Sequence, residues 1–225
     1  GIRENLLKYD EVNNEQREVV YAERRQVLDG ENMRELIMKM LNDIVEGAVD
    51  MSVSDEQTPE NWGFKELNDL LLPIIPLKPI ELTDEISKMS KDEFKHMLKE
   101  LATKFYESKE AEFPDAEQIR EIERVVLLKV IDNKWMSHID DMDQLRQGIG
   151  LQAYGQRDPV VEYKMNAYEM FEAMTAAITE ETVRILFHIR VEQKVEREPA
   201  AKVTGTNRDT SAPQAPKVRQ VQKIY

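Results

Sequence analysis

The chain has 225 residues, of which 33% are charged and 41% are hydrophobic, and its formal net charge is −13. This negative charge argues against a sequence-independent nucleic-acid binder, because such proteins use Lys and Arg to displace counterions from phosphates, and no nucleic-acid partner is expected. The chain has no cysteine, which excludes a disulfide framework and a thiolate zinc site and favours a reducing compartment.

The first predicted element is a helix that begins at Ile2 and ends at the break Asp29-Gly30. Its apolar stripe is weak, because polar residues interrupt it at Asn13, Asn14, Gln16 and Arg17. We therefore expect this helix either to pack against something outside the chain or to present polar contacts. No capping residue precedes Ile2, which suggests that the sequence is a fragment whose first helix starts upstream.

Residues 31–113 are predicted to form a small helical subdomain inserted between longer helices. A clear helical period begins at Met33. The following segment is rich in proline and permits at most a short helix at about 64–72. Ser90 and Glu93 then match a capping box and predict the start of another helix, which ends before Pro114.

Residues 115–147 contain no glycine or proline and predict one helix about 50 Å long, at roughly 1.5 Å per residue. The glycine-rich turn "GIGLQAYGQRDP" follows, and it closes with Asp158-Pro159, an N-cap followed by a proline suited to the first helical position. A second helix is expected from there to about Glu198. Two long helices joined by a short turn predict an antiparallel helical hairpin.

Residues 199–225 are predicted to be a flexible, disordered tail. They are rich in Ala, Pro, Thr and Gln and poor in large apolar residues, so they cannot bury enough surface to offset the entropy of ordering. They are also basic, whereas the remainder of the chain is acidic. The expected fold class for the whole sequence is all-α.

No phosphate-binding loop, dinucleotide fingerprint or nucleophile elbow is present. The histidines are far apart in sequence, which argues against a metal or catalytic role for any of them. They are His96, His138 and His188. The aspartates of "DNKWMSHIDDMDQLRQ" lack the glycine turn of a calcium loop and are interpreted as a solvated or partner-facing surface. Trp135 is either a core anchor or part of a binding groove.

Tyr154 is the most unusual residue of the chain, because it places an aromatic ring within the turn of the predicted hairpin. One interpretation is that Leu151 and Tyr154 fold back as a cap over the helix ends. The other is that they touch a partner, since loops held by a rigid scaffold are common contact sites.

Two stretches of the sequence are distinctive: "IRENLLKYDEVNNEQREVVYAERRQVL" and "VLLKVIDNKWMSHIDDMDQLRQGIGLQAYGQRDPVVEYKMNAYEMF". Both resemble the SecA family, the ATP-driven motors of bacterial preprotein translocation. The resemblance is to the C-terminal third of the family and extends from residue 2 to about residue 171. It implies a distal scaffold helix (1–30), a helical wing (31–113), a two-helix finger with scaffold helix (114–198) and a flexible linker (199–225).

The resemblance also implies contacts. In the family an aromatic at the fingertip contacts the translocating polypeptide, and the matching residue is Tyr154. We expect its neighbours Leu151, Gln156 and Arg157 to take part, and Trp135, Asp140 and Arg146 to make scaffold or clamp contacts. The implied partners are the SecY/SecE/SecG channel, unfolded preprotein with its signal peptide, and the motor domains; a homodimer is left open. The implied location is the cytoplasm and the cytoplasmic face of the bacterial plasma membrane.

No nucleotide-binding domain and no terminal zinc element matches this sequence. ATP and Mg²⁺ are therefore expected in the parent protein only, and no catalytic residue, cofactor or metal is expected in this fragment. The missing zinc element indicates either a truncation or a lineage without it. The alternative to a motor fragment is a free-standing helical adaptor or a self-associating scaffold without motor function.

Overall fold

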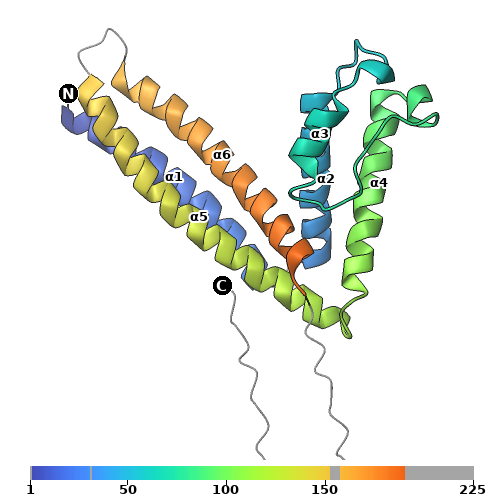
Figure 1. Ribbon diagram of the computed structural model, residues 1–225. Coiled ribbons are helices and arrows are strands. Elements are labelled where there is room, and N and C mark those ends of the chain that lie inside the picture. The colour runs from blue at the N-terminus through green and yellow to red at the C-terminus, as the bar shows by residue number, and fades with distance from the viewer. Residues whose placement is uncertain (1, 31, 153–157, 191–225) are drawn as a thin grey trace, which may run out of the picture. The chain divides into compact units, whose positions relative to one another are not determined.

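The computed structural model describes residues 2–30, 32–152 and 158–190, and for Ile2 and residues 150–152 the backbone alone (Figure 1). Within these ranges the chain forms helices and no strand, which confirms the predicted all-α class. The helices are α1 Ile2–Leu28, α2 Met33–Ser52, α3 Phe64–Leu71, α4 Lys91–Glu110, α5 Ala116–Gln152 and α6 Pro159–His188, with the short 3-10 helices η1 Pro59–Asn61 and η2 Ile86–Lys88. The tail 199–225 lies outside the described residues.

The helix α1 lies along both long helices of the hairpin, α5 and α6 (Figure 1). Tyr9, Val20 and Val27 are buried at helical spacing on one face of α1 and pack with residues of α5 and α6. The buried face of this weakly apolar helix therefore finds its partner within the chain rather than outside it. Polar contacts, the other expectation, are also present, because the buried Gln16 on the same face donates a hydrogen bond to α6.

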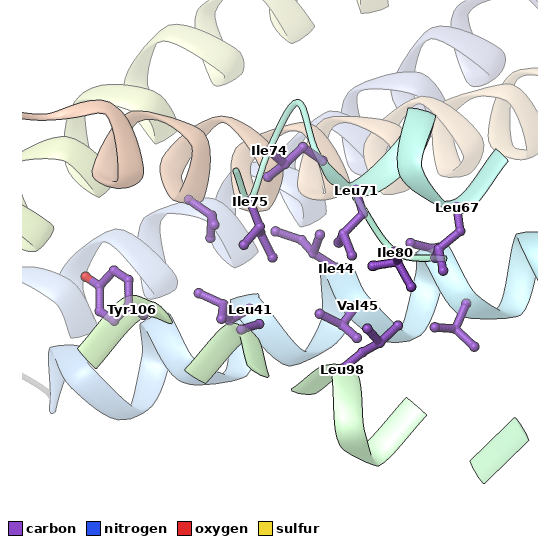
Figure 2. Close-up of a cluster of buried hydrophobic side chains, with 14 of the residues drawn as sticks. Leu41, Ile44, Val45, Leu67, Leu71, Ile74, Ile75, Ile80, Leu98 and Tyr106 are labelled. Atoms are coloured by element: carbon purple, nitrogen blue, oxygen red, sulfur yellow. The ribbon is translucent and has the colours of Figure 1, made fainter. Parts of the chain in front are cut away.

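The helices α2, α3 and α4 enclose a separate apolar cluster, which we call the α2–α4 core (Figure 2). Fully buried leucines from each helix meet there, such as Leu41 of α2, Leu67 of α3 and Leu98 of α4. The proline-rich segment after α3 adds Ile74, Ile75 and Ile80 to the cluster. Helical periodicity in three short helices thus produces one shared apolar interior.

Asn68 holds the proline-rich segment against α3. Its Nδ2 donates to the carbonyl oxygen of Ile80 at 2.8 Å, and the backbone amide of Ile80 donates to Asn68 Oδ1 at 2.9 Å. A side-chain amide can satisfy a backbone donor and acceptor together, as a strand neighbour would. The irregular segment therefore closes the α2–α4 core without secondary structure of its own.

The predicted helix starts are confirmed by their caps. Ser90 Oγ accepts from the backbone amide of Glu93 while the Glu93 carboxylate accepts from the backbone amide of Ser90, a complete capping box. Asp158 accepts from the amide of Val160 at 2.9 Å, with Pro159 in the first turn of α6. The expected end of the second helix at about Glu198 is wrong. The α6 helix ends at His188, because Ile189 adopts an extended conformation there.

The end of α6 joins the hairpin to the α2–α4 core. Val183, Leu186 and Phe187 are buried members of that core. The ring of Phe187 stacks on Phe105 at a centroid distance of 5.3 Å and meets Tyr106 edge-on at 5.5 Å. The last turns of α6 are therefore shared by both parts of the fold. No helix within the described ranges is both long and apolar enough to cross a membrane.

Candidate functional site

The hairpin of α5 and α6 positions the predicted contact residues. The two helices have 37 and 30 residues and lie side by side (Figure 1). Tyr154, Gln156 and Arg157 lie outside the described residues, and the side chain of Leu151 is not described although its backbone belongs to the last turn of α5. Their predicted contacts therefore stay predictions, and the described structure shows what supports the turn.

Two tyrosines brace the turn end of the hairpin against α1. The rings of Tyr9 on α1 and Tyr163 on α6 lie 4.3 Å apart between centroids. The hydroxyl of Tyr163 donates to Asn13 Oδ1 at 2.9 Å, and burial raises the pKa of Tyr163 above its ordinary value. Buried apolar side chains from α5 and α6, such as Ile149 and Val160, complete this cluster. The helix segments beside the turn are thus held by both apolar packing and a hydrogen bond.

Arg146 and Asp140, the predicted polar contacts of α5, differ in their surroundings. The guanidinium of Arg146 is 3.2 Å from Asp143 on its own helix and 3.8 Å from Asp10 on α1, measured between nitrogen and carboxylate oxygen. Arg146 therefore also ties α5 to α1. Asp140 is exposed and belongs to an acidic surface with Asp141 and Asp143, as the sequence suggested.

Trp135 occupies the middle of the α1–α5–α6 packing. Only 8% of its surface is exposed, and it is a member of the apolar cluster that contains Val20 and Ile178. It also lines a surface hollow of about 490 Å³ between α1 and α5, together with Tyr21 and Met136. Trp135 thus serves as a core anchor whose edge reaches a groove, so its two interpretations do not exclude each other.

Gln16 makes the central polar contact between the three helices. Its Nε2 donates to the carbonyl oxygen of Ala167 on α6 at 3.0 Å, and its Oε1 lies 2.7 Å from His138 Nε2 on α5. Because an amide oxygen only accepts, His138 Nε2 carries the shared proton. The His138 ring also lies against Trp135 and Phe171. We call Gln16, His138 and the Ala167 carbonyl the Gln16 cluster.

An ion pair continues this contact along α1. Arg24 Nε and Nη2 face the two carboxylate oxygens of Asp132 on α5 at 2.9 and 3.4 Å. A guanidinium and a carboxylate that meet through two such bonds have a defined relative orientation. Together with the Gln16 cluster, this pair sets the register of α1 against α5.

The described part of the chain offers no group of three His, Asp or Glu side chains arranged to hold a metal ion. The histidines lie on three different helices. His96 on α4 is near Glu100, His138 belongs to the Gln16 cluster, and His188 contacts the carbonyl oxygen of Arg184. Each of them thus has a local structural contact.

Comparison with known proteins identifies the family. The family described as "SecA Wing and Scaffold domain" matches residues 1–190. The chain belongs to the SecA family.

Several SecA relatives align with nearly the whole chain. The protein translocase subunit SecA of Lachnoclostridium phytofermentans is 64% identical over 225 residues, which are 100% of this chain and 26% of the relative. The SecA 1 subunits of Alkaliphilus metalliredigens and Clostridioides difficile are 42% and 44% identical over 98% and 100% of this chain, and over 25% of each relative. The chain spans about a quarter of the length of these curated relatives and corresponds to the wing and scaffold region of SecA.

Within this SecA region, the sequence prediction missed the Gln16 cluster and a buried carboxylate. Gln16 was interpreted as an interruption of an apolar stripe, and only the arrangement of three helices shows what it binds. Glu123 on α5 is fully buried, accepts a hydrogen bond from the hydroxyl of Tyr106 and pairs with Arg120 at 2.9 Å. Burial raises the pKa of Glu123. The only sequence signal was a glutamate at a core-facing helical position.

Proposed function

We propose that this chain is the scaffold, wing and finger portion of a preprotein-translocating motor. In this proposal residues 1–30 are the distal scaffold helix, 31–113 the wing, 114–198 the finger with scaffold helix, and 199–225 a linker. The whole protein works at the cytoplasmic face of the bacterial plasma membrane, on the SecY/SecE/SecG channel. Its motor domains bind ATP and Mg²⁺, and the chain described here relays their movement to the polypeptide.

The observation that carries this proposal is the length and bracing of the hairpin. At about 1.5 Å per residue, the 37 residues of α5 extend for about 55 Å without an internal proline. The α1 helix supports both α5 and α6 through apolar packing, the Gln16 cluster and the Arg24–Asp132 pair. A hairpin supported along its side can transmit displacement to its turn.

The chemistry of the turn supports the fingertip contact that the family resemblance implies. Tyr154 is an aromatic residue between Gly150 and Gly155. A tyrosine ring contacts both apolar and polar groups at low cost in side-chain entropy, so it suits a substrate of variable sequence. We infer that Tyr154 contacts preprotein, with Leu151, Gln156 and Arg157 beside it, and that Trp135, Asp140 and Arg146 make scaffold or clamp contacts.

The test is photo-cross-linking in the full-length protein that contains this chain. A benzoylphenylalanine at position 154 keeps an aromatic ring there and should cross-link to the translocating polypeptide or to the channel. The same group at Val125, an exposed residue on α5, is the control and should give neither product.

Replacing the ring measures its contribution. Loss of about 1 kcal/mol of aromatic contact should slow translocation roughly fivefold in Tyr154→Ala, whereas Tyr154→Phe keeps the ring and most of the rate. Normal translocation by Tyr154→Ala together with no cross-link from position 154 would overturn the proposal. A cross-link from position 154 to a second copy of the chain would instead favour a self-associating scaffold.

A further inference from the structure

A groove of about 630 Å³ lies between α2 and α6, away from the turn of the hairpin. Small residues of both helices line its floor. They are Gly47 and Ala48 of α2, and Thr175 and Ala176 of α6. A Cβ atom added at Gly47 would meet no other atom within 4 Å, so the space above it is open. Small residues along two neighbouring helices leave the kind of trough into which a third helix packs.

The apolar surface continues from the groove along α6. Val161, Met165 and Tyr168 are 53%, 61% and 63% exposed, although such side chains are often buried. They follow one another at intervals of four and three residues, which places them on one face of α6. Tyr168 also lines the groove. One face of α6 therefore presents an apolar stripe from the first turn of the helix into the groove.

The walls of this groove favour a helical occupant over an extended one. The lining residues belong to α2, α3 and α6, except for Ile74, whose amide donates to the carbonyl oxygen of Leu71. Backbone groups inside helices are already paired, so these walls offer no free edge for a strand to join. An occupant must satisfy its own backbone hydrogen bonds, as an α-helix does.

The charged residues that line the groove are all acidic. Asp43, Glu172 and Glu180 line the groove, and no Lys or Arg is among its lining residues. Glu172 accepts a hydrogen bond from the hydroxyl of Tyr168 at 2.7 Å, which places a carboxylate beside the apolar stripe. Carboxylates around an apolar groove complement a partner that has basic residues next to an apolar face.

We propose that the groove between α2 and α6, with the stripe from Val161 to Tyr168, docks an amphipathic α-helix of a second polypeptide that carries Lys or Arg beside its apolar face. This surface goes beyond the fingertip contact and uses different residues. Its partner is a folded helix, recognised by an apolar stripe and positive charge, rather than an extended chain.

The probe is a fluorescent peptide of about 18 residues, enough for a helix about 27 Å long. Leucines form its apolar face, and lysines and alanines form its polar face. Its binding to the 225-residue chain is followed by fluorescence anisotropy at low salt.

Gly47→Leu fills the groove floor and should weaken binding at least tenfold, which is about 1.4 kcal/mol of lost contact. Gly148→Leu is the matched control, because a Cβ atom there also meets nothing within 4 Å and Gly148 lies on α5.

A second variant allows the same test if the first one does not fold. Leucine favours helix more than glycine does, so Gly47→Leu should keep the helical circular dichroism of the chain. Should that variant unfold, Ala176→Phe blocks the same groove from its α6 wall and should weaken binding to a similar extent. Unchanged binding by a folded Gly47→Leu or Ala176→Phe variant overturns the proposal.

Charge and shape of the partner are tested separately. Asp43→Asn combined with Glu180→Gln should weaken binding several-fold at low salt, because two attractive charges are removed. Glu11→Gln combined with Glu18→Gln on α1 makes the same change in net charge outside the groove and should leave binding unchanged.

Equal binding of a peptide with glutamates in place of the lysines, or of one with a scrambled leucine order, overturns the proposed partner chemistry. Tyr154→Ala should bind the probe normally, which separates this surface from the fingertip.

Discussion

At the scale of single residues, the Gln16 cluster is the feature that could not be predicted from apolar periodicity alone. Gln16 bonds to His138 and to the Ala167 carbonyl at once, so the two buried polar side chains, Gln16 and His138, each have a partner. A buried polar group without a partner costs about 1–3 kcal/mol. The cluster therefore favours the one arrangement of α1, α5 and α6 in which these groups meet.

The burial of His138 predicts a pH-dependent stability. Burial lowers its pKa below the ordinary value of 6.5, against a smaller opposing effect of Asp141. The unfolded chain then binds a proton at pH values where the folded chain does not. The stabilising contribution is complete above about pH 6.5 and is lost as the pH falls toward the folded pKa. The free energy of unfolding should fall with decreasing pH in this window.

A neutral replacement isolates this effect. His138→Gln keeps an Nε2 donor for Gln16 and cannot titrate, so it should remove up to about 1.4 kcal/mol per pH unit from the slope of stability just below pH 6.5. Urea unfolding at several pH values measures the slope. An identical slope for the wild type and His138→Gln would contradict the expected shift.

At the scale of secondary-structure elements, the caps determine where α4 and α6 begin. The capping box of Ser90 and Glu93 pairs two backbone amides that α4 itself leaves unpaired. The hydrogen bond from the Ser90 amide lowers the pKa of Glu93. Asp158 accepts a hydrogen bond from one such amide, that of Val160, at the start of α6. These starts depend on residues within one turn of each other.

A pair of substitutions on α4 tests the capping box. Ser90→Ala removes the acceptor at the N-cap and should destabilise the chain by about 1 kcal/mol. Ser108→Ala is the matched change in the last turns of the same helix and should be neutral or slightly stabilising, because alanine is the better helix former there. Thermal unfolding followed by circular dichroism measures both. Equal destabilisation by the two variants would show that the box contributes nothing specific.

At the scale of the folded region formed by α1–α6, the α2–α4 core and the apolar cluster around Trp135 share α6. The α2–α4 core contains Trp62, and the cluster between α1, α5 and α6 contains Trp135. Met40 and Val126 pack against both clusters. The rings of Phe187, Phe105 and Tyr106 fasten the end of α6 to α4. We therefore expect the two clusters to unfold together as long as this contact is intact.

Phe187→Ala tests this coupling. The loss of a buried ring should cost about 3–5 kcal/mol. Trp135→Phe leaves Trp62 as the fluorescent reporter of the α2–α4 core, and Trp62→Phe leaves Trp135 as the reporter of the other cluster. The urea transitions of these two single-tryptophan variants should coincide when Phe187 is present. When Phe187→Ala is added to each, the transitions should separate, and Trp62 should report unfolding at the lower urea concentration. Transitions that stay coincident in the Phe187→Ala background would show that other contacts couple the clusters.

Much of the fold could be predicted from local patterns. The apolar period identified helices on both sides of the glycine-rich turn, and the signals at Ser90 and Asp158 gave the starts of α4 and α6 correctly. The predicted end of α6 was wrong, because a helical period does not by itself mark the residue at which a helix stops. Local signals therefore located the elements better than their ends.

The sequence by itself determined the all-α class, the hairpin and its caps, because these depend on residues a few positions apart. Only the tertiary structure decided that Gln16 meets His138 and Ala167, that Trp135 is both a core anchor and a groove wall, and that Gly47 faces open space beside α6. These contacts join residues that are distant in the chain. They exist because helix faces with complementary shape and polar groups pack together, and no local pattern encodes which faces will meet.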